Sequence, residues 1–235
     1  MISCSLCATD LQIINNSLSD FELVPEMKMI RDGVLVDYKC PKCDSRVRNR
    51  TLSRLLNFMG DFFLGKSRKL LLVSSPKKER SIISKYSNNV MHISLQGNFG
   101  DEKCVEGMDI CDLKNIPNAS FDFVLACCVL DYIPDLKKVF AEQSRILKSG
   151  GRFIFWIMPF RLNGVNGCRI KHTNALAHES YAHSGKPETG IPDCEFSVDW
   201  IFDQAGLTGL RMYQILMLDD ISGLADRWFV AEKIG

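Results

Sequence analysis

Two hydrophobic patterns alternate along the middle of the chain. Between residues 67 and 158, short continuous apolar runs are separated by stretches in which apolar residues recur every three or four positions. Short apolar runs predict buried strands, and the three-to-four spacing predicts helices. Because strands that alternate with helices pair in parallel through crossovers, this pattern predicts an α/β domain with a parallel sheet. The predicted strands are Lys69–Val73, Val90–Leu95, Phe121–Val129 and Arg152–Met158, and the predicted helices are Lys77–Tyr86 and Leu136–Leu147.

The flanking segments have different patterns. Apolar positions from Val47 to Leu64 recur at helical spacing, which predicts a connecting amphipathic helix. Residues 159–195 are rich in Gly, Asn and His and weakly periodic, which favours a cap or loop insertion that carries substrate contacts. Regular periodicity returns in a predicted helix, Ser197–Ala205, and in two predicted strands, Arg211–Leu218 and Arg227–Lys233.

These changes of pattern predict three parts. They are a small module over residues 1–46, a connecting helix over 47–66, and a main domain over 67–235 that contains the insertion at about 159–195. A chain of 235 residues with 46% hydrophobic content can bury one full core, whereas a 46-residue appendage needs a metal or a disulfide to fold. We therefore expect one main domain and a cross-linked module.

Charge and hydropathy narrow the classes of partner and location. The formal net charge is +1, so no strong field attracts polyanions, although a short basic cluster runs from Arg46 to Arg54. The chain lacks a secretory signal pattern and a membrane-spanning apolar stretch of roughly 20 residues. These features predict a cytoplasmic protein with a small-molecule substrate and without nucleic-acid or membrane partners. A protein partner or a homodimer is also consistent with them.

The module carries two pairs of cysteines with metal-ligand spacing. Cys4 and Cys7 form one C-x-x-C pair, and Cys40 and Cys43 form the other. Such a pair places two thiolates on one tight turn, and two pairs supply the four ligands of a tetrahedral zinc ion. Since all four positions would be protein ligands, the zinc would be structural. A redox dithiol or unrelated buried cysteines are the alternatives.

Several motifs of the main domain carry a family resemblance. They lie at Met108–Leu113 (MDICDL), Asn118–Val124 (NASFDFV), Val129–Asp135 (VLDYIPD), Glu142 and Arg145–Gly151 (RILKSGG). This stretch resembles the class I S-adenosylmethionine (SAM)-dependent methyltransferases, of the type that acts on small molecules. The cysteine pairs and the following Arg46, Arg48 and Arg50 resemble a bacterial group in which a zinc module precedes such a domain.

The resemblance implies a Rossmann-like, seven-stranded, mostly parallel sheet with helices on both faces. It also implies a SAM site at the carboxyl ends of the first strands. On the positions that match, the cofactor would contact Ser74, Ser75, Gln96, Asp109, Ile110 and Cys127. Asp109 would accept a hydrogen bond from the adenine amino group, with Ile110 against the ring. Asp109 and Asp112 could instead cap the turn that follows them, and Asp122 reads as architectural.

Two regions of the predicted cofactor site depart from the family pattern. The loop after the first strand is Ser74-Ser75-Pro76-Lys77-Lys78, where the family has Gly-x-Gly-x-Gly. Gln96 stands in the region where the family has a ribose-binding acid. In these two regions, the groups that could bind the cofactor are the hydroxyls of Ser74 and Ser75 and the side-chain amide of Gln96.

The leading functional hypothesis is an enzyme that methylates a small molecule, such as a sugar-linked or secondary metabolite. Methyl transfer from SAM needs an aligned nucleophile and, for some acceptors, one base. Asp131, Tyr132 and His172 are the candidate catalytic residues, with Asp131 or His172 as the base. The departures from the pattern raise the alternative of an inactive methyltransferase fold that acts as a binding or assembly partner. An RNA methyltransferase that uses the Arg46–Arg54 cluster is the third hypothesis.

Overall fold

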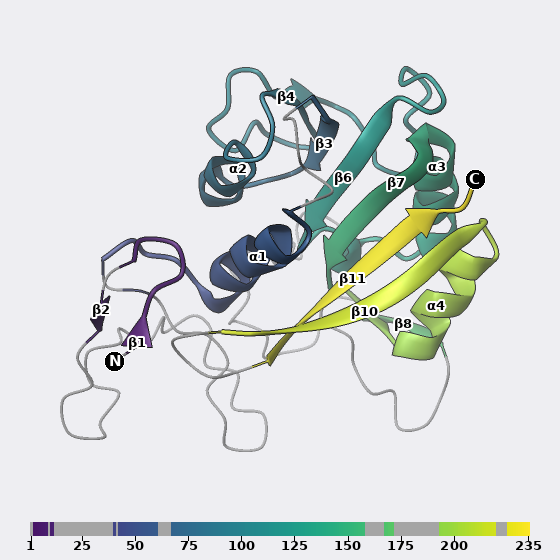
Figure 1. Ribbon diagram of the computed structural model, residues 1–235. Coiled ribbons are helices and arrows are strands. Elements are labelled where there is room, and N and C mark those ends of the chain that lie inside the picture. Colours follow the sequence, from purple (N-terminus) through teal and green to yellow (C-terminus); the bar gives the residue numbers. More distant parts are fainter. Residues whose placement is uncertain are drawn as a thin grey trace. The chain divides into compact units, whose positions relative to one another are not determined.

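A seven-stranded sheet organises the computed structural model, which describes residues 2–8, 10–11, 40, 42–60, 67–157, 167–171, 193–219 and 225–235. The strand order is β10-β11-β7-β6-β3-β4-β5 (Figure 1). The strands are β3 (Lys69–Val73), β4 (Asn89–Ser94), β5 (Val105–Glu106), β6 (Phe121–Cys127), β7 (Leu147–Trp156), β10 (Leu210–Leu218) and β11 (Ala225–Lys233). Strands β5, β4, β3, β6 and β7 pair in parallel, and β11 runs antiparallel to β7. The predicted mostly parallel, seven-stranded sheet is confirmed.

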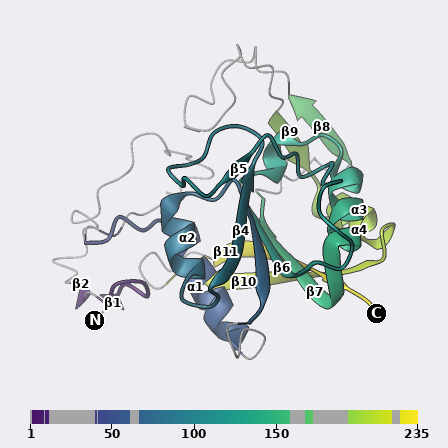
Figure 2. The same cartoon turned by 90° about the horizontal axis from the view of Figure 1, so that it is seen from above.

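Helices cover the two faces of the sheet. Figure 2 shows α2 (Lys77–Ile83) on one side and α3 (Leu136–Ile146) and α4 (Val198–Gly206) on the other. The Asp135 side chain accepts the Lys138 amide at 3.2 Å and begins α3, and Ser197 caps α4 in the same manner. The face under α3 and α4 holds the main aromatic core, in which the Phe155 ring stacks on Phe229 at 5.3 Å between centroids.

Several elements differ from the sequence-based expectation. Strand β7 begins at Leu147, because the predicted glycine turn is a bulge opposite Phe121–Phe123 in which Gly150 has a φ of 70°. Strand β5 and the 3-10 turn η4 (Leu130–Tyr132) were not predicted, since each has three residues or fewer. The insertion contains an antiparallel pair, β8 (Cys168–Lys171) and β9 (Asp193–Phe196). Residues 158–166 and 172–192 of the insertion lie outside the described residues.

The chain divides into two compact units. One comprises residues 1–62, 175–184 and 216–226, and the other comprises 63–174, 185–215 and 227–235. The first unit includes the antiparallel pair β1 (Ile2–Ser3) and β2 (Asp10–Leu11) and the helix α1 (Val47–Phe58). Residues 61–66, at the end of the predicted connecting helix, are outside the described part. No helix in the described ranges is long and apolar enough to cross a membrane.

A buried ion pair ties α1 to the segment that follows β10. The Arg50 guanidinium donates to both carboxylate oxygens of Asp219, at 2.6 and 2.8 Å, and neither side chain is exposed. Arg50 also donates to the backbone carbonyl of Ser45. In the next helical position, Thr51 Oγ1 donates to Asp226 at 2.7 Å. Arg50 therefore does not face solvent, which removes it from the basic cluster that the RNA hypothesis invoked.

Removing Arg50 alone should destabilise the protein more than removing both members of the Arg50–Asp219 pair. Arg50→Met removes the guanidinium that pairs with the buried Asp219 carboxylate, which should lower the free energy of unfolding by about 3–5 kcal/mol. The double variant Arg50→Met/Asp219→Leu removes both charges and should recover much of that loss. Thermal and urea unfolding measure both effects. Asp112→Asn, which removes an exposed pair with Lys114, is the control and should change little.

Candidate functional site

The carboxyl ends of the parallel strands meet at one edge of the sheet. Strand β3 pairs with β4 on one side and with β6 on the other, so the chain reverses its direction of progress between β3 and β6. Ligands of open α/β sheets bind at such a switch point. Ser74 directly follows β3 and Cys128 directly follows β6, and both have left-handed backbones, with φ of 48° and 53°. Strained residues of this kind cluster at functional sites.

Ser74 reproduces the backbone of a glycine without being one. An L-residue in the left-handed region is less favourable by about 1–2 kcal/mol, which explains why glycine is usual there. The Ser74 amide donates to the Ile93 carbonyl at 2.8 Å, and its hydroxyl lies 3.4 Å from that of Ser94. The loop therefore keeps a glycine-like turn through bonds to β4.

The backbone of Ser75 is bonded on both sides. Its amide donates to Nε2 of His92 at 3.1 Å, and its carbonyl accepts from Nη1 of Arg80 at 2.6 Å. Asp101 Oδ2 lies 2.9 Å from His92 Nδ1 and 3.5 Å from Arg80 Nε. The Ser75 hydroxyl is different, because it is fully buried and has no hydrogen-bond partner among the described residues. A buried hydroxyl without a partner is costly, so it marks a place where a ligand atom or water can bond.

Burial and charge set the protonation of this network. Burial lowers the pKa of His92, and the nearby Arg80 charge acts in the same direction, although the hydrogen bond to Asp101 opposes them. Burial alone would raise the pKa of Asp101, but the bonds from His92 and the Lys103 amide bring it below its ordinary value. Neutral His92 beside ionised Asp101 is the resulting state.

Sequence reasoning did not identify His92, Arg80 or Asp101 as site residues. A histidine in an otherwise apolar strand was the available signal, since a buried imidazole needs a partner. The end of β4 differs from the family pattern as expected. Ser94 Oγ bonds to the amide and carbonyl of Gln96, and the Gln96 side chain is exposed. The nearest following acid, Asp101, is already engaged by His92 and Arg80.

Asp109 closes a local turn and is half-buried. Its Oδ1 accepts a hydrogen bond from the Cys111 amide at 2.8 Å. Asp109 therefore has the turn-capping role that was the alternative to cofactor contact. Ile110 is 4% exposed and belongs to the core under α3 and α4. Asp112 is exposed and pairs with Lys114 at 2.7 Å. One oxygen of Asp109 is thus committed to the backbone, and cofactor contact by Asp109 or Ile110 stays a prediction.

Two residues of α3 hold the loop that follows Asp109. Glu142 accepts the Leu113 amide at 2.8 Å and pairs with Arg145 at 2.8 Å. Arg145 in turn donates to the carbonyls of Leu113 and Ile116, at 2.8 and 2.7 Å. The hydrogen bond from Arg145 is the main cause that lowers the pKa of Glu142. These bonds explain the presence of an acid and a base on α3, because both side chains hold the backbone of the loop after Asp109.

The candidate catalytic residues lie beyond the end of β6. Asp131 and Tyr132 are half-buried in the turn η4, and β9 of the insertion contacts η4. His172 lies outside the described residues. Cys127 is the buried last residue of β6. Asp122 is the second residue of the same strand, at the opposite edge of the sheet, where it binds the Lys69 amide at 2.9 Å and Lys148 at 2.8 Å, so its contacts are architectural as expected.

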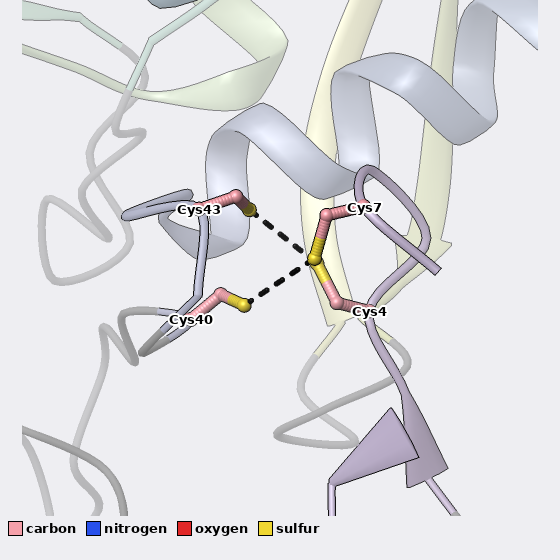
Figure 3. A group of neighbouring side chains, drawn as sticks. All are labelled: Cys4, Cys7, Cys40 and Cys43. Atoms are coloured by element: carbon pink, nitrogen blue, oxygen red, sulfur yellow. Dashed lines mark hydrogen bonds between the residues drawn. The ribbon is translucent and has the colours of Figure 1, made fainter. Parts of the chain in front are cut away.

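The four cysteines of the module converge on one point (Figure 3). Their sulfurs all lie within 4.8 Å of one another, with 3.8 Å between Cys4 and Cys43 and between Cys7 and Cys40. A disulfide would need about 2.05 Å. A tetrahedron with Zn–S bonds of about 2.3 Å separates its sulfurs by about 3.8 Å, so the cluster fits a tetrahedral metal.

The two cysteine turns have the same backbone. The residue after each pair, Ala8 or Asp44, is left-handed, with φ of 54° and 57°. Each donates its amide to the carbonyl of the first cysteine of its pair at 2.8 Å. Ser45 Oγ lies 3.1 Å from the Cys43 sulfur and 3.5 Å from that of Cys4. A serine hydroxyl at this distance can stabilise thiolate ligands as an outer-shell donor.

Comparisons with known proteins agree with this architecture. Residues 83–155 match a family model described as a methyltransferase domain. The sterol 4-C-methyltransferase strm-1 of Caenorhabditis elegans is 35% identical over 72 residues, which are 31% of this chain and 21% of that protein. This chain thus matches about a fifth of the length of that curated relative.

Solved structures share the fold at low sequence identity. A SAM-dependent methyltransferase from Clostridium acetobutylicum is 15% identical, with a TM-score of 0.55 over 83% of this chain and 94% of that one. The 1,6-didemethyltoxoflavin-N1-methyltransferase of Burkholderia thailandensis is 14% identical, with a TM-score of 0.53 over 80% of this chain and 78% of that one. The strand order and these likenesses define the class of fold: the chain has the class I SAM-dependent methyltransferase fold, and residues 83–155 match the family model of a methyltransferase domain.

Mild acid should destabilise the protein through His92. Because the folded-state pKa of His92 is below its ordinary value of 6.5, the unfolded chain binds this proton more readily. The contribution of neutral His92 to the free energy of unfolding is therefore complete above about pH 6.5, and it is lost as the pH falls toward the lower folded-state pKa. Thermal unfolding from pH 8 to pH 5 should show a steeper loss in the wild type than in His92→Gln. Equal losses of thermal stability with falling pH in the wild type and in His92→Gln would contradict a lowered pKa of His92.

Proposed function

We propose that the protein is a SAM-dependent methyltransferase that acts on a small-molecule acceptor. The observation that carries this proposal is the buried, unpartnered hydroxyl of Ser75 at the switch point of a sheet with the methyltransferase strand order. The match to a methyltransferase domain supports the reaction class. The partial match to a sterol methyltransferase, a protein whose name gives a small-molecule substrate, supports the class of acceptor.

The residues that would hold the cofactor are Ser74, Ser75, Gln96, Asp109, Ile110 and Cys127. When bound, SAM supplies an activated methyl group to a nucleophile in line with its sulfur. The Ser75 hydroxyl can donate a hydrogen bond to the cofactor, whereas the Ser75 amide is already bonded to His92. Gln96 offers an amide in place of the ribose-binding acid, and neutral hydrogen bonds are about half as strong as charged ones. We infer moderate affinity for SAM.

Asp131 is the proposed base, with Tyr132 beside it to orient the acceptor. Both residues follow β6 at the carboxyl edge of the sheet, and β9 of the insertion contacts their turn. Asp131 can take the proton that a hydroxyl or amine acceptor loses as the methyl group arrives. His172 belongs to the same insertion in sequence and is the second candidate for this step.

An inactive binding protein is the second candidate function. The specific observation in its favour is the exposed amide of Gln96 where an acid binds the ribose in the family. In that case the fold would bind a protein partner, or a second copy of the chain, without methyl transfer. Ligand binding separates the two candidates.

We also propose that Cys4, Cys7, Cys40 and Cys43 hold one structural zinc ion. Four thiolates leave no open position for water or substrate, so the ion would stabilise the module without taking part in the reaction. Iron prefers the same four-sulfur geometry, which makes metal identification part of the test.

Titration calorimetry with SAM and S-adenosylhomocysteine tests the cofactor proposal. We expect binding by the wild type and about tenfold weaker binding by Ser75→Ala, which loses one hydrogen bond to the ligand. Thermal stability of Ser75→Ala should be equal or higher, because the substitution removes a buried hydroxyl without a partner. The absence of heat with either ligand at millimolar concentration would favour the inactive binding protein.

Metal analysis of the purified protein tests the zinc proposal. We expect about one zinc per chain, and a lower melting temperature after chelation or in Cys40→Ser, because binding free energy contributes to folding. Cys104→Ser is the matched control, since Cys104 lies outside the cluster, and it should keep both metal and stability. Full stability in a metal-free wild type would overturn the proposal.

A further inference from the structure

Four residues around the loop between β3 and α2 form a closed ring of polar contacts. Ser75 N donates to His92 Nε2 at 3.1 Å, and His92 Nδ1 lies 2.9 Å from Asp101 Oδ2. The same Asp101 oxygen lies 3.5 Å from Arg80 Nε, and Arg80 Nη1 donates to the Ser75 carbonyl at 2.6 Å. The ring therefore leaves Ser75 through its amide and returns to it through its carbonyl.

The ring has one consistent direction of donation. Because the Ser75 N–H donates to Nε2, that nitrogen carries no proton, and neutral His92 must hold its proton on Nδ1. Nδ1–H then donates to the Asp101 carboxylate, which also faces the Arg80 guanidinium. Asp101 thus fixes the tautomer of His92, and His92 fixes the Ser75 amide. His92 itself is 4% exposed, so water does not compete at this position.

Arg80 extends the restraint to the segment after β4. Its guanidinium also donates to the carbonyls of Phe99 and Gly100, at 3.1 and 3.2 Å. Arg80 consequently bonds both the loop after β3 and the segment after β4, and Asp101 contacts Arg80 and His92. In this family the first of these loops is usually shaped by glycines, which are absent here.

The strained backbone next to the ring needs such support. Ser74 is left-handed, and a residue in that region persists only where its surroundings over-determine it. The ring bonds both backbone groups of the next residue, and β4 bonds the Ser74 amide. The only group of Ser75 without a partner in the described structure is its hydroxyl.

We propose that His92, oriented by Asp101 and assisted by Arg80, is a positioning residue that replaces the missing glycines. It holds the loop in the conformation that presents the Ser75 hydroxyl to the cofactor. The inference rests on the proposed function, because it assumes that SAM binds at this edge. His92 makes no contact with the reacting atoms and is not a catalytic residue.

A matched pair of amide substitutions separates positioning from simple packing. Gln places an amide oxygen near the position of Nε2, so His92→Gln can still accept the Ser75 amide. Asn reaches only the position of Nδ1, so His92→Asn can contact Asp101 but not Ser75. Both variants bury one neutral amide. We expect His92→Asn to bind S-adenosylhomocysteine about tenfold more weakly than the wild type and His92→Gln less than about threefold more weakly.

Amide exchange of Ser75, followed by NMR in the ligand-free protein, gives a second readout. The Ser75 amide should be protected in the wild type and in His92→Gln and should exchange about tenfold faster in His92→Asn. This measurement does not depend on the cofactor. If the wild type binds no S-adenosylhomocysteine, the proposed function fails, and the exchange data still decide whether His92 holds the loop.

Asp101 supplies an independent variant in case His92→Asn does not fold. Asp101→Ala removes the group that orients the imidazole and should expose the Ser75 amide to exchange and weaken ligand binding. Glu102→Ala, an exposed carboxylate in the adjacent position, is the control and should change neither. Equal affinities and equal exchange rates in all the variants would overturn the inference, as would equal losses in His92→Gln and His92→Asn.

Discussion

Parallel pairing of β3 with both β4 and β6 is the constraint on which the candidate site depends. It aligns the carboxyl ends of three strands, so that residues distant in sequence follow those strands at one edge. The same pairing makes β3 the point where the chain changes direction across the sheet. A crevice at that position accepts ligands in many α/β proteins, because loops on both sides diverge there. Ser75, Gln96 and the turn that holds Asp131 all belong to this edge.

The loop after β3 shows how one backbone shape can be reached by two different means. Glycine reaches a left-handed turn because it has no Cβ, and it leaves room for a ligand to approach the backbone. Here a serine takes the same φ, and bonds from His92, Arg80 and β4 offset the strain. The consequence is chemical as well as conformational, since the Ser75 amide is bonded to His92, whereas its buried hydroxyl has no hydrogen-bond partner among the described residues.

The N-terminal unit depends on a different interaction. Four sulfurs meet in a geometry that suits a tetrahedral metal, and Ser45 lies between two of these sulfurs and the Arg50–Asp219 pair. The cysteine turns, the start of α1 and the segment after β10 are therefore connected by polar contacts within one unit. A buried bidentate ion pair tolerates little displacement, so it fixes the relative position of α1 and the segment after β10 more strongly than surface contacts would.

The sequence alone determined the strand-and-helix pattern, the seven-stranded sheet through its family motifs, and the two cysteine turns. The hydrophobic period and the C-x-x-C spacing are local, because they act over a few residues, whereas the number of strands in the sheet came from the resemblance to a known family. Tertiary structure alone decided the partners of buried polar groups, such as Ser75 with His92, 17 residues away, and Arg50 with Asp219, 169 residues away. Such pairs depend on strand register and crossover, which no local pattern encodes. For the same reason Asp101 could not be recognised from the sequence as a partner of His92, whereas the four cysteines could be recognised as one cluster.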